Sequence, residues 1–234
     1  EHTGLKRIYR EAIVWRRWQK KVLQCLKMAD SVHHCLPSET CNRSEIRESN
    51  LRFIYKDWTT AEFQQNKEYD YRSVIIGNSG DPTNNHLDAI YQLAKFSSSI
   101  NRVLIPLSYG GDYNYVEQVE AFAKDVFTPS KVVTLKKWLP VDDYERVVSQ
   151  YGTLLLYHRR QQGAGNFALA LKQNKNVILH SNGPLQAWAQ TYGLDFSEME
   201  LSAPRYNDEQ KKKLLKFFSM STSHQFMKFL ATEL

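Results

Sequence analysis

Short apolar runs and longer amphipathic segments alternate between residues 73 and 180. The runs from Val103 to Leu107 and from Val177 to Leu179 carry no charge and have the length of strands. We therefore predict strands at 73–78, 102–107, 131–135, 153–158 and 176–180, separated by helices at 84–97, 113–127, 141–150 and 164–173. Strands that are apolar on both faces and joined by helices are typical of a parallel sheet covered on both sides, so the sequence predicts an α/β fold.

The beginning of the chain has a different pattern. Apolar residues recur from Leu5 to Met28 at spacings of three, four and seven, which predicts an amphipathic helix. This segment holds eight Lys or Arg residues and one acid, Glu11, so the net positive charge of the chain is concentrated there. A strand at 31–36 and a polar helix at 38–49 are predicted next. Residues 51–71 show no clear period, and we place a domain boundary in this stretch.

The basic segment has two interpretations. Arg16, Arg17, Lys20 and Lys21 could face an anionic membrane surface, where each nearby base contributes about 1 kcal/mol. Alternatively they form a solvated face above an apolar stripe that packs on its own domain. Nucleic acid is not expected as a partner, because the sequence has no zinc finger, aromatic RNA-binding signature or recognition-helix pattern.

Composition narrows the class of protein. A mean hydropathy of −0.54 is typical of a soluble domain, and no apolar run approaches the roughly 20 residues of a spanning helix. The sequence starts at Glu1 without a signal-peptide pattern, so we expect that its start was cut or renumbered. Three cysteines, an odd number, favour a reducing compartment. A zinc site is one interpretation of the cluster His33, His34, Cys35 and Cys41. The cluster has no paired C-x-x-C motif, so we expect no metal there.

Two loops that follow predicted strands are candidate ligand sites, because ligands bind beyond the carboxyl ends of parallel strands. The loop from Gly77 to His86 is small and polar throughout, and its candidates for binding phosphate oxygens are Asn78, Ser79, Gly80, Asp81 and Asn84. The alternative is a tight turn in which Asp81 or Thr83 caps the helix. In the second loop, arginines precede a glycine-rich helix start, and the diphosphate candidates are Arg160, Gln161, Gln162, Gly163, Gly165 and Asn166.

Two further loops lie on the same rim: residues 108–112, after the strand at 102–107, and residues 136–140, after the strand at 131–135. After the strand at 131–135, Trp138 and Leu139 offer an apolar surface for a nucleotide base. Candidate acids and bases on the rim are Asp81, His86, Asp112 and His180, although a lone histidine is more often structural. The sequence does not identify the catalytic residue, and Asp81 and His86 are the candidates for it.

The two ligand loops together resemble glycosyltransferase family 56. The resemblance lies in the run from Val74 to His86 and in Arg160-Gln161-Gln162-Gly163-Ala164-Gly165, and it extends from about Leu5 to Phe196. The order of elements between the loops agrees, including Asp142 and Tyr144 in the helix after Trp138. The family is known for transfer of 4-acetamido-4,6-dideoxygalactose in enterobacterial common antigen assembly.

The resemblance implies a GT-B enzyme with two Rossmann-like domains. On that basis residues 73–205 are the donor domain, 1–60 the tail of the acceptor domain, 61–72 a linker and 206–234 one or more C-terminal helices. It also implies a dTDP-sugar donor, a polyprenyl-diphosphate-linked saccharide acceptor, and a peripheral location at the cytoplasmic face of the bacterial inner membrane. Since no Asp-x-Asp motif is present, we expect no cofactor or metal, and charge on the leaving diphosphate would be neutralised by helix termini and Arg160.

Parts of the chain depart from the family. The loop from Tyr109 to Asn114 and the stretch from Ser181 to Tyr192 match weakly, which leaves the donor sugar open. Two other functions remain: a sugar-nucleotide epimerase of the same architecture, and a non-catalytic module docked to a membrane. The exact acceptor, the stereochemical course, the catalytic base and the oligomeric state are not predicted.

Overall fold

The computed structural model describes residues 32–34, 51–53 and 68–219. The chain divides into two compact units, Glu1–Ile54 and Tyr55–Leu234. In the first unit, β1 (Val32–His34) pairs in parallel with β2 (Leu51–Phe53). The strand predicted at 31–36 is therefore found, whereas β2 was not predicted. The predicted helices at 5–28 and 38–49, and with them the basic membrane candidates, lie outside the described residues.

The second unit contains a parallel sheet of five strands. They are β3 (Ser73–Ile76), β4 (Arg102–Pro106), β5 (Val132–Leu135), β6 (Thr153–Leu156) and β7 (Asn176–Leu179), in the order β5-β4-β3-β6-β7. The chain adds strands on one side of β3 and then returns to add β6 and β7 on the other. The strand order thus reverses between β3 and β6, which is the topological switch point where open α/β sheets bind ligands.

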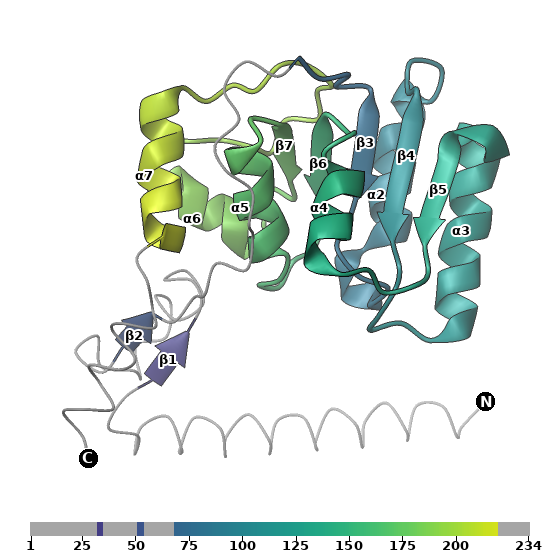
Figure 1. The fold of residues 1–234 in the computed structure, drawn as a ribbon, viewed down its shortest axis with the longest axis horizontal. Coiled ribbons are helices and arrows are strands. Elements are labelled where there is room, and N and C mark those ends of the chain that lie inside the picture. Colours follow the sequence, from purple (N-terminus) through teal and green to yellow (C-terminus); the bar gives the residue numbers. More distant parts are fainter. Residues whose placement is uncertain (1–31, 35–50, 54–67, 220–234) are drawn as a thin grey trace, which may run out of the picture. The chain divides into compact units, whose positions relative to one another are not determined.

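Helices cover both faces of this sheet, as Figure 1 shows. The side chains of Val74, Ile76, Val103 and Ile105 pack with α2 (His86–Leu93) and α3 (Tyr113–Phe127) in one buried layer. On the other face lie α4 (Val141–Val148) and α5 (Ala164–Lys172), and the chain continues through α6 (Pro184–Gln190) to α7 (Asp208–Ser219). All four residues of β3, β6 and β7 are buried, in keeping with their continuous apolar sequence. The predicted α/β fold is confirmed.

Local backbone geometry corrects the predicted boundaries. The first strand ends at Ile76 rather than at residue 78, because Gly77 has a φ of 74° and turns the chain out of the sheet. The helix predicted from residue 84 is split, since Asn85 has a φ of 53° and separates a 3₁₀ turn (Pro82–Asn84) from α2. A positive φ lies in the left-handed region and interrupts a right-handed α-helix. The spacing of apolar residues alone does not reveal such an interruption.

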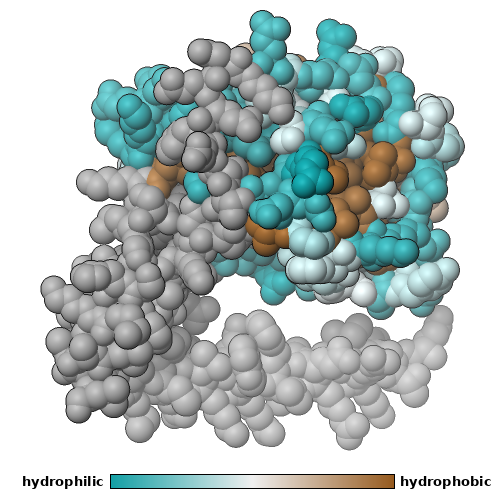
Figure 2. Space-filling view, viewed as in Figure 1, coloured by the Kyte–Doolittle hydropathy of each residue, from teal (hydrophilic) through white to brown (hydrophobic). Residues whose placement is uncertain are grey.

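Among the described residues, no helix is both long and apolar enough to span a membrane. The same part of the chain contains no group of three or more acidic, histidine or cysteine side chains arranged to hold a metal ion. Exposed apolar surface does occur, over α4 and β5 (Figure 2), and Val133 and Val141 are exposed residues of these two elements.

Candidate functional site

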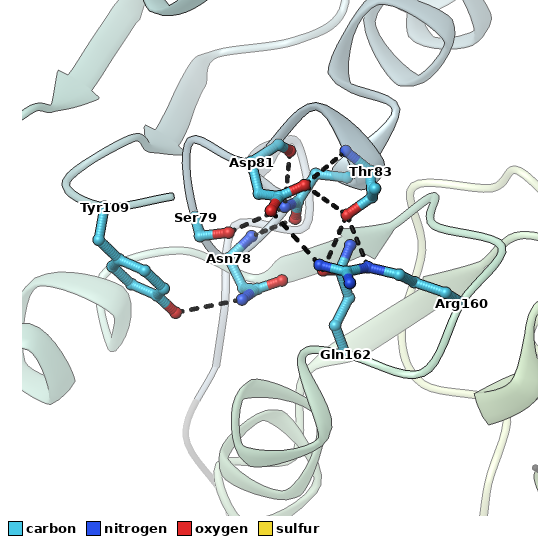
Figure 3. Close-up of polar contacts among 8 residues, drawn as sticks. Asn78, Ser79, Asp81, Thr83, Tyr109, Arg160 and Gln162 are labelled. Carbon is cyan, nitrogen blue, oxygen red and sulfur yellow. Dashed lines mark hydrogen bonds and ion pairs between the residues drawn. The ribbon is translucent and has the colours of Figure 1, made fainter. Parts of the chain in front are cut away.

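The structure brings the two candidate loops together at the switch point. Thr83 of the first loop contacts Gln162 of the second through Oγ1 and Oε1 at 3.2 Å (Figure 3). The Nδ2 of Asn85 donates to the carbonyl of Tyr157 at 3.1 Å, just after β6. Residues nearly eighty positions apart in sequence therefore form one surface at the carboxyl ends of β3 and β6.

The first loop is organised around the buried amide of Asn84. Its Oδ1 accepts from the backbone N–H of Asn78 at 3.0 Å, and its Nδ2 donates to Ser79 Oγ at 3.0 Å. A Cβ at Gly77 would lie 2.7 Å from His86 Nε2 and 2.9 Å from Asn84 Oδ1, so only glycine fits at this turn. The side chains of Ser79 and Asn84 are thus used inside the loop, and they fix its backbone.

Asp81 starts the 3₁₀ turn at the outer side of this loop. Its Oδ1 accepts from the backbone N–H of Thr83 at 2.9 Å and from Thr83 Oγ1 at 2.6 Å. These hydrogen bonds from Thr83, together with the nearby Arg160, hold the pKa of the Asp81 carboxyl below its usual value. The carboxylate is therefore ionised at neutral pH. Capping by Asp81, which was the structural alternative for this loop, is present here.

Gly80 connects this loop to the one after β4. Its N–H donates to the carbonyl of Tyr109 at 2.7 Å. A Cβ at Gly111 would overlap the carbonyl oxygen of Gly80, so the two backbones cross in direct contact. The absence of a side chain at Gly111 therefore permits this packing between the loops. Tyr109 is held where its hydroxyl accepts a hydrogen bond from Asn78 Nδ2 at 3.3 Å (Figure 3).

Arg160 reaches across from the second loop to the first. Its Nε donates to Thr83 Oγ1 at 2.8 Å, and its guanidinium lies 3.4 Å from Asp81 Oδ2 and 3.2 Å from Gln162 Oε1 (Figure 3). The side chain is 57% exposed, so solvent screens the pair and a ligand has access to the guanidinium. Arg160 thus has a carboxylate partner and still presents an accessible positive charge.

Gly163 is the N-cap of α5 and has a φ of 70°. A Cβ there would lie 3.0 Å from His158 Nε2 and 3.3 Å from Asn78 Oδ1, so a larger residue would press on both loops. The first turn of α5 also contains Gly165, which is buried, and Asn166. The positive end of the helix dipole points to the switch point, and Gln161 lies half-buried beside it.

A cavity of about 180 Å³ opens beside this helix start. Residues from three strand ends and two helices line it: Asn78, Pro106, Ser108, Tyr109, Trp138, Leu139, Val141, Tyr144 and Asn166. Trp138 is 69% exposed at the rim. The predicted base-binding residues therefore share one cavity with two predicted phosphate ligands, Asn78 and Asn166. Tyr109 and Tyr144 were not proposed as ligands. The signal for Tyr109 was its place just after β4, and the signal for Tyr144 was its agreement with the family in the helix after Trp138.

The histidines on this rim are neutral. Burial, followed by the nearby His158, lowers the pKa of His86 to about 4, and His86 Nδ1 lies 3.1 Å from the hydroxyl of Tyr115. Burial also lowers the pKa of His158 to about 4 and shifts that of His180 downward. His86 is fully buried and braces α2 against α3, an arrangement that gives it no access to an acceptor. Asp112 caps α3, its Oδ1 accepting from Tyr115 N at 2.9 Å.

This fold, with a cavity at its switch point, is that of the GT-B glycosyltransferases. The chain is similar to WaaG, a glycosyltransferase involved in lipopolysaccharide biosynthesis, with a TM-score of 0.51 at 11% identity, over 81% of this chain and 54% of that one. It is similar to TarM at a TM-score of 0.55 and 12% identity, over 91% of this chain and 45% of that one. A mutant of S. aureus TarM in complex with Fondaparinux, alpha-GlcNAc-glycerol and UDP matches at 0.53 and 13% identity, over 91% and 45%.

The family follows from the sequence match. The model of the family described as 4-alpha-L-fucosyltransferase glycosyl transferase group 56 matches residues 9–232. The chain belongs to this glycosyltransferase family, which confirms the resemblance of its two loops. It spans about half the length of the solved structures it resembles.

Proposed function

We propose that the unit containing β3 to β7 binds a nucleotide-diphosphate sugar and that the protein transfers the sugar to a second saccharide. The observation that carries this proposal is the cavity of about 180 Å³ beside the glycine-rich start of α5. Trp138 and Leu139 give the cavity an apolar surface for a base, and Asn166 of the first turn of α5 lines it at a helix start that suits a diphosphate. The loop that leads into this helix also carries the exposed guanidinium of Arg160, which could neutralise the diphosphate charge.

The finer proposal names the substrates. We infer a dTDP-linked 4-acetamido-4,6-dideoxyhexose as donor and a polyprenyl-diphosphate-linked saccharide as acceptor, supported by membership of the family and by the loop sequences that led to it. The nucleotide base would lie against Trp138 and Leu139, and the diphosphate would face the N–H groups at Gly163 to Gly165 and the guanidinium of Arg160. These N–H groups and the guanidinium would stabilise the negative charge that develops on the leaving diphosphate, so this site would need no metal ion.

Location is part of the proposal. A polyprenyl-linked acceptor is held in a bilayer, and the basic segment from Leu5 to Met28 has the charge to lie at an anionic surface. We place the protein at the cytoplasmic face of the bacterial inner membrane as a peripheral protein. Arg16, Arg17, Lys20 and Lys21 would face the lipid.

Titration with dTDP tests the core of this proposal. We expect dTDP to bind this chain and to compete with a dTDP-sugar for the same site, with EDTA having no effect on affinity. Titration calorimetry and two-dimensional NMR measure this directly. Absence of both heat and chemical-shift change at millimolar dTDP would contradict the assignment. Product analysis with donor alone separates transfer from epimerisation, because an epimerase needs no acceptor.

A further inference from the structure

Two residues from neighbouring helices meet in the wall of the cavity. Tyr144 belongs to α4 and Asn166 to the first turn of α5, and the phenol of Tyr144 donates to Asn166 Oδ1 at 3.0 Å. Both residues line the cavity of about 180 Å³. Because a carboxamide is planar, this bond fixes the direction of the opposite atom, Nδ2.

The bond is maintained over the working pH range. Burial, together with the nearby Tyr109, raises the pKa of the Tyr144 phenol, so Tyr144 keeps its proton at neutral and mildly alkaline pH. Within the described residues, Asn166 Nδ2 forms no hydrogen bond. It is also not among the buried polar atoms that lack a partner, so it is open to the cavity. Asn166 therefore presents an oriented N–H donor to the cavity.

The position of this donor indicates which part of a nucleotide it meets. Asn166 shares the cavity with the apolar residues Trp138 and Leu139, and it lies one turn after Gly163, the N-cap of its helix. Asn78 lies across from them, its Oδ1 3.3 Å from the Cβ position of Gly163. A nucleotide that spans from the apolar wall to Gly163 places its pentose between them, beside Asn166.

We propose that Asn166 Nδ2 donates a hydrogen bond to the 3′-hydroxyl of the pentose, and that Tyr144 is the positioning residue that holds Asn166 for this contact. The inference rests on the proposed function, because it assigns a role within the same nucleotide site. It adds a contact to the pentose that is independent of the base and of the diphosphate. A neutral hydrogen bond contributes about 0.5–1.5 kcal/mol, which corresponds to roughly two- to tenfold in affinity.

The test compares two ligands across four proteins. The ligands are dTDP and its 3′-deoxy analogue, and the proteins are the wild type, Asn166→Ala, Tyr144→Phe and the double variant. We expect the wild type to prefer dTDP by roughly two- to tenfold and Asn166→Ala to bind both ligands equally. Tyr144→Phe should reduce the preference as well, and it should have no further effect in the Asn166→Ala background, because Tyr144 acts through Asn166.

A matched control separates positioning from stability. Tyr206 is a buried tyrosine, and its hydroxyl donates to the carbonyl of Lys175 at 2.6 Å, at the amino end of β7. Tyr206→Phe should lower the melting temperature and leave the ligand preference unchanged. Equal binding of both ligands by the wild type, or an unchanged preference in Asn166→Ala, would overturn the inference while leaving the nucleotide site intact. Failure of the wild type to bind either ligand would overturn the proposed function itself.

Discussion

Arg160 is bound by a carboxylate in this structure, and that contact determines how its substitution should behave. Its guanidinium lies 3.4 Å from Asp81 Oδ2, and its Nε donates to Thr83 Oγ1 at 2.8 Å. A diphosphate oxygen would compete with Asp81 for the same positive group. Removing Arg160 and removing the charge of Asp81 should therefore change nucleotide affinity in opposite directions.

The two effects differ in size. A charge-assisted hydrogen bond to a diphosphate is worth about 1.5–3 kcal/mol, so Arg160→Ala should weaken dTDP binding by roughly ten- to a hundredfold. Asp81→Asn removes the competing charge of an exposed pair that is worth at most about 1 kcal/mol, so affinity should rise by up to roughly fivefold. Asparagine also caps helix starts well, and the turn at Pro82–Asn84 should persist in that variant.

Stability provides the discriminating measurement. The Arg160 and Asp81 side chains are 57% and 31% exposed, so their pairing contributes little to folding, and Arg160→Ala should lower the melting temperature by only a few degrees. The assay is titration calorimetry with dTDP beside thermal unfolding on the same preparations. A folded Arg160→Ala protein with unchanged dTDP affinity and a clearly lower melting temperature would refute the ligand role and leave Arg160 as a structural brace.

Three more outcomes are expected. Gly163→Val should reduce dTDP affinity by at least tenfold in calorimetry, because Gly163 has a φ of 70° and a Cβ would lie 3.0 Å from His158 Nε2; equal affinity would contradict the close approach of ligand to backbone. The folded-state pKa values of His86 and His158 are lowered to about 4, below the unfolded value of about 6.5. The free energy of unfolding should therefore be highest above pH 6.5 and should fall from there toward pH 4 by up to about 1.4 kcal/mol per pH unit for each histidine. Urea unfolding at several pH values checks this, and His86→Gln should flatten the slope. Liposomes with anionic lipid should retain the protein at low salt and release it near 1 M salt, where the Debye length is about 3 Å; equal retention on neutral liposomes would contradict the role of Arg16, Arg17, Lys20 and Lys21.

The sheet could be predicted because its strands are buried on both faces. Burial on both faces requires continuous apolar runs, and such runs are visible in the sequence without any tertiary information. The loop ends were harder to predict, because the turn at Gly77 and the left-handed Asn85 depend on contacts with Asn84, His86 and Tyr157 that form only in the folded unit.

The candidate loops could be predicted, but the roles of their side chains could not. A polar loop at the end of a parallel strand is typical of a ligand site, whichever of its residues touch the ligand. The partner of Arg160 is 79 positions away, and the bond between Tyr144 and Asn166 joins two helices whose relative rotation has no signature in the sequence. Side-chain pairing of this kind follows from packing between elements, which a one-dimensional pattern does not contain.

The loop side chains divide into those that build the site and those that remain accessible. Asn84 and Ser79 are buried and hydrogen-bonded to each other, and His86 is buried against Tyr115, so each of them holds the backbone in place. Arg160 and the cavity amide of Asn166 are left to meet a ligand. A substitution at Asn84 should therefore weaken nucleotide binding only as far as it unfolds the loop, whereas a substitution at Arg160 should weaken binding in a loop that is still folded. The proposed diphosphate contacts come from backbone N–H groups and one guanidinium, and the proposed contact of Asn166 is to a 3′-hydroxyl. Any nucleoside diphosphate offers these groups, so selection among nucleotides must depend on the base, beside Trp138 and Leu139 in the cavity.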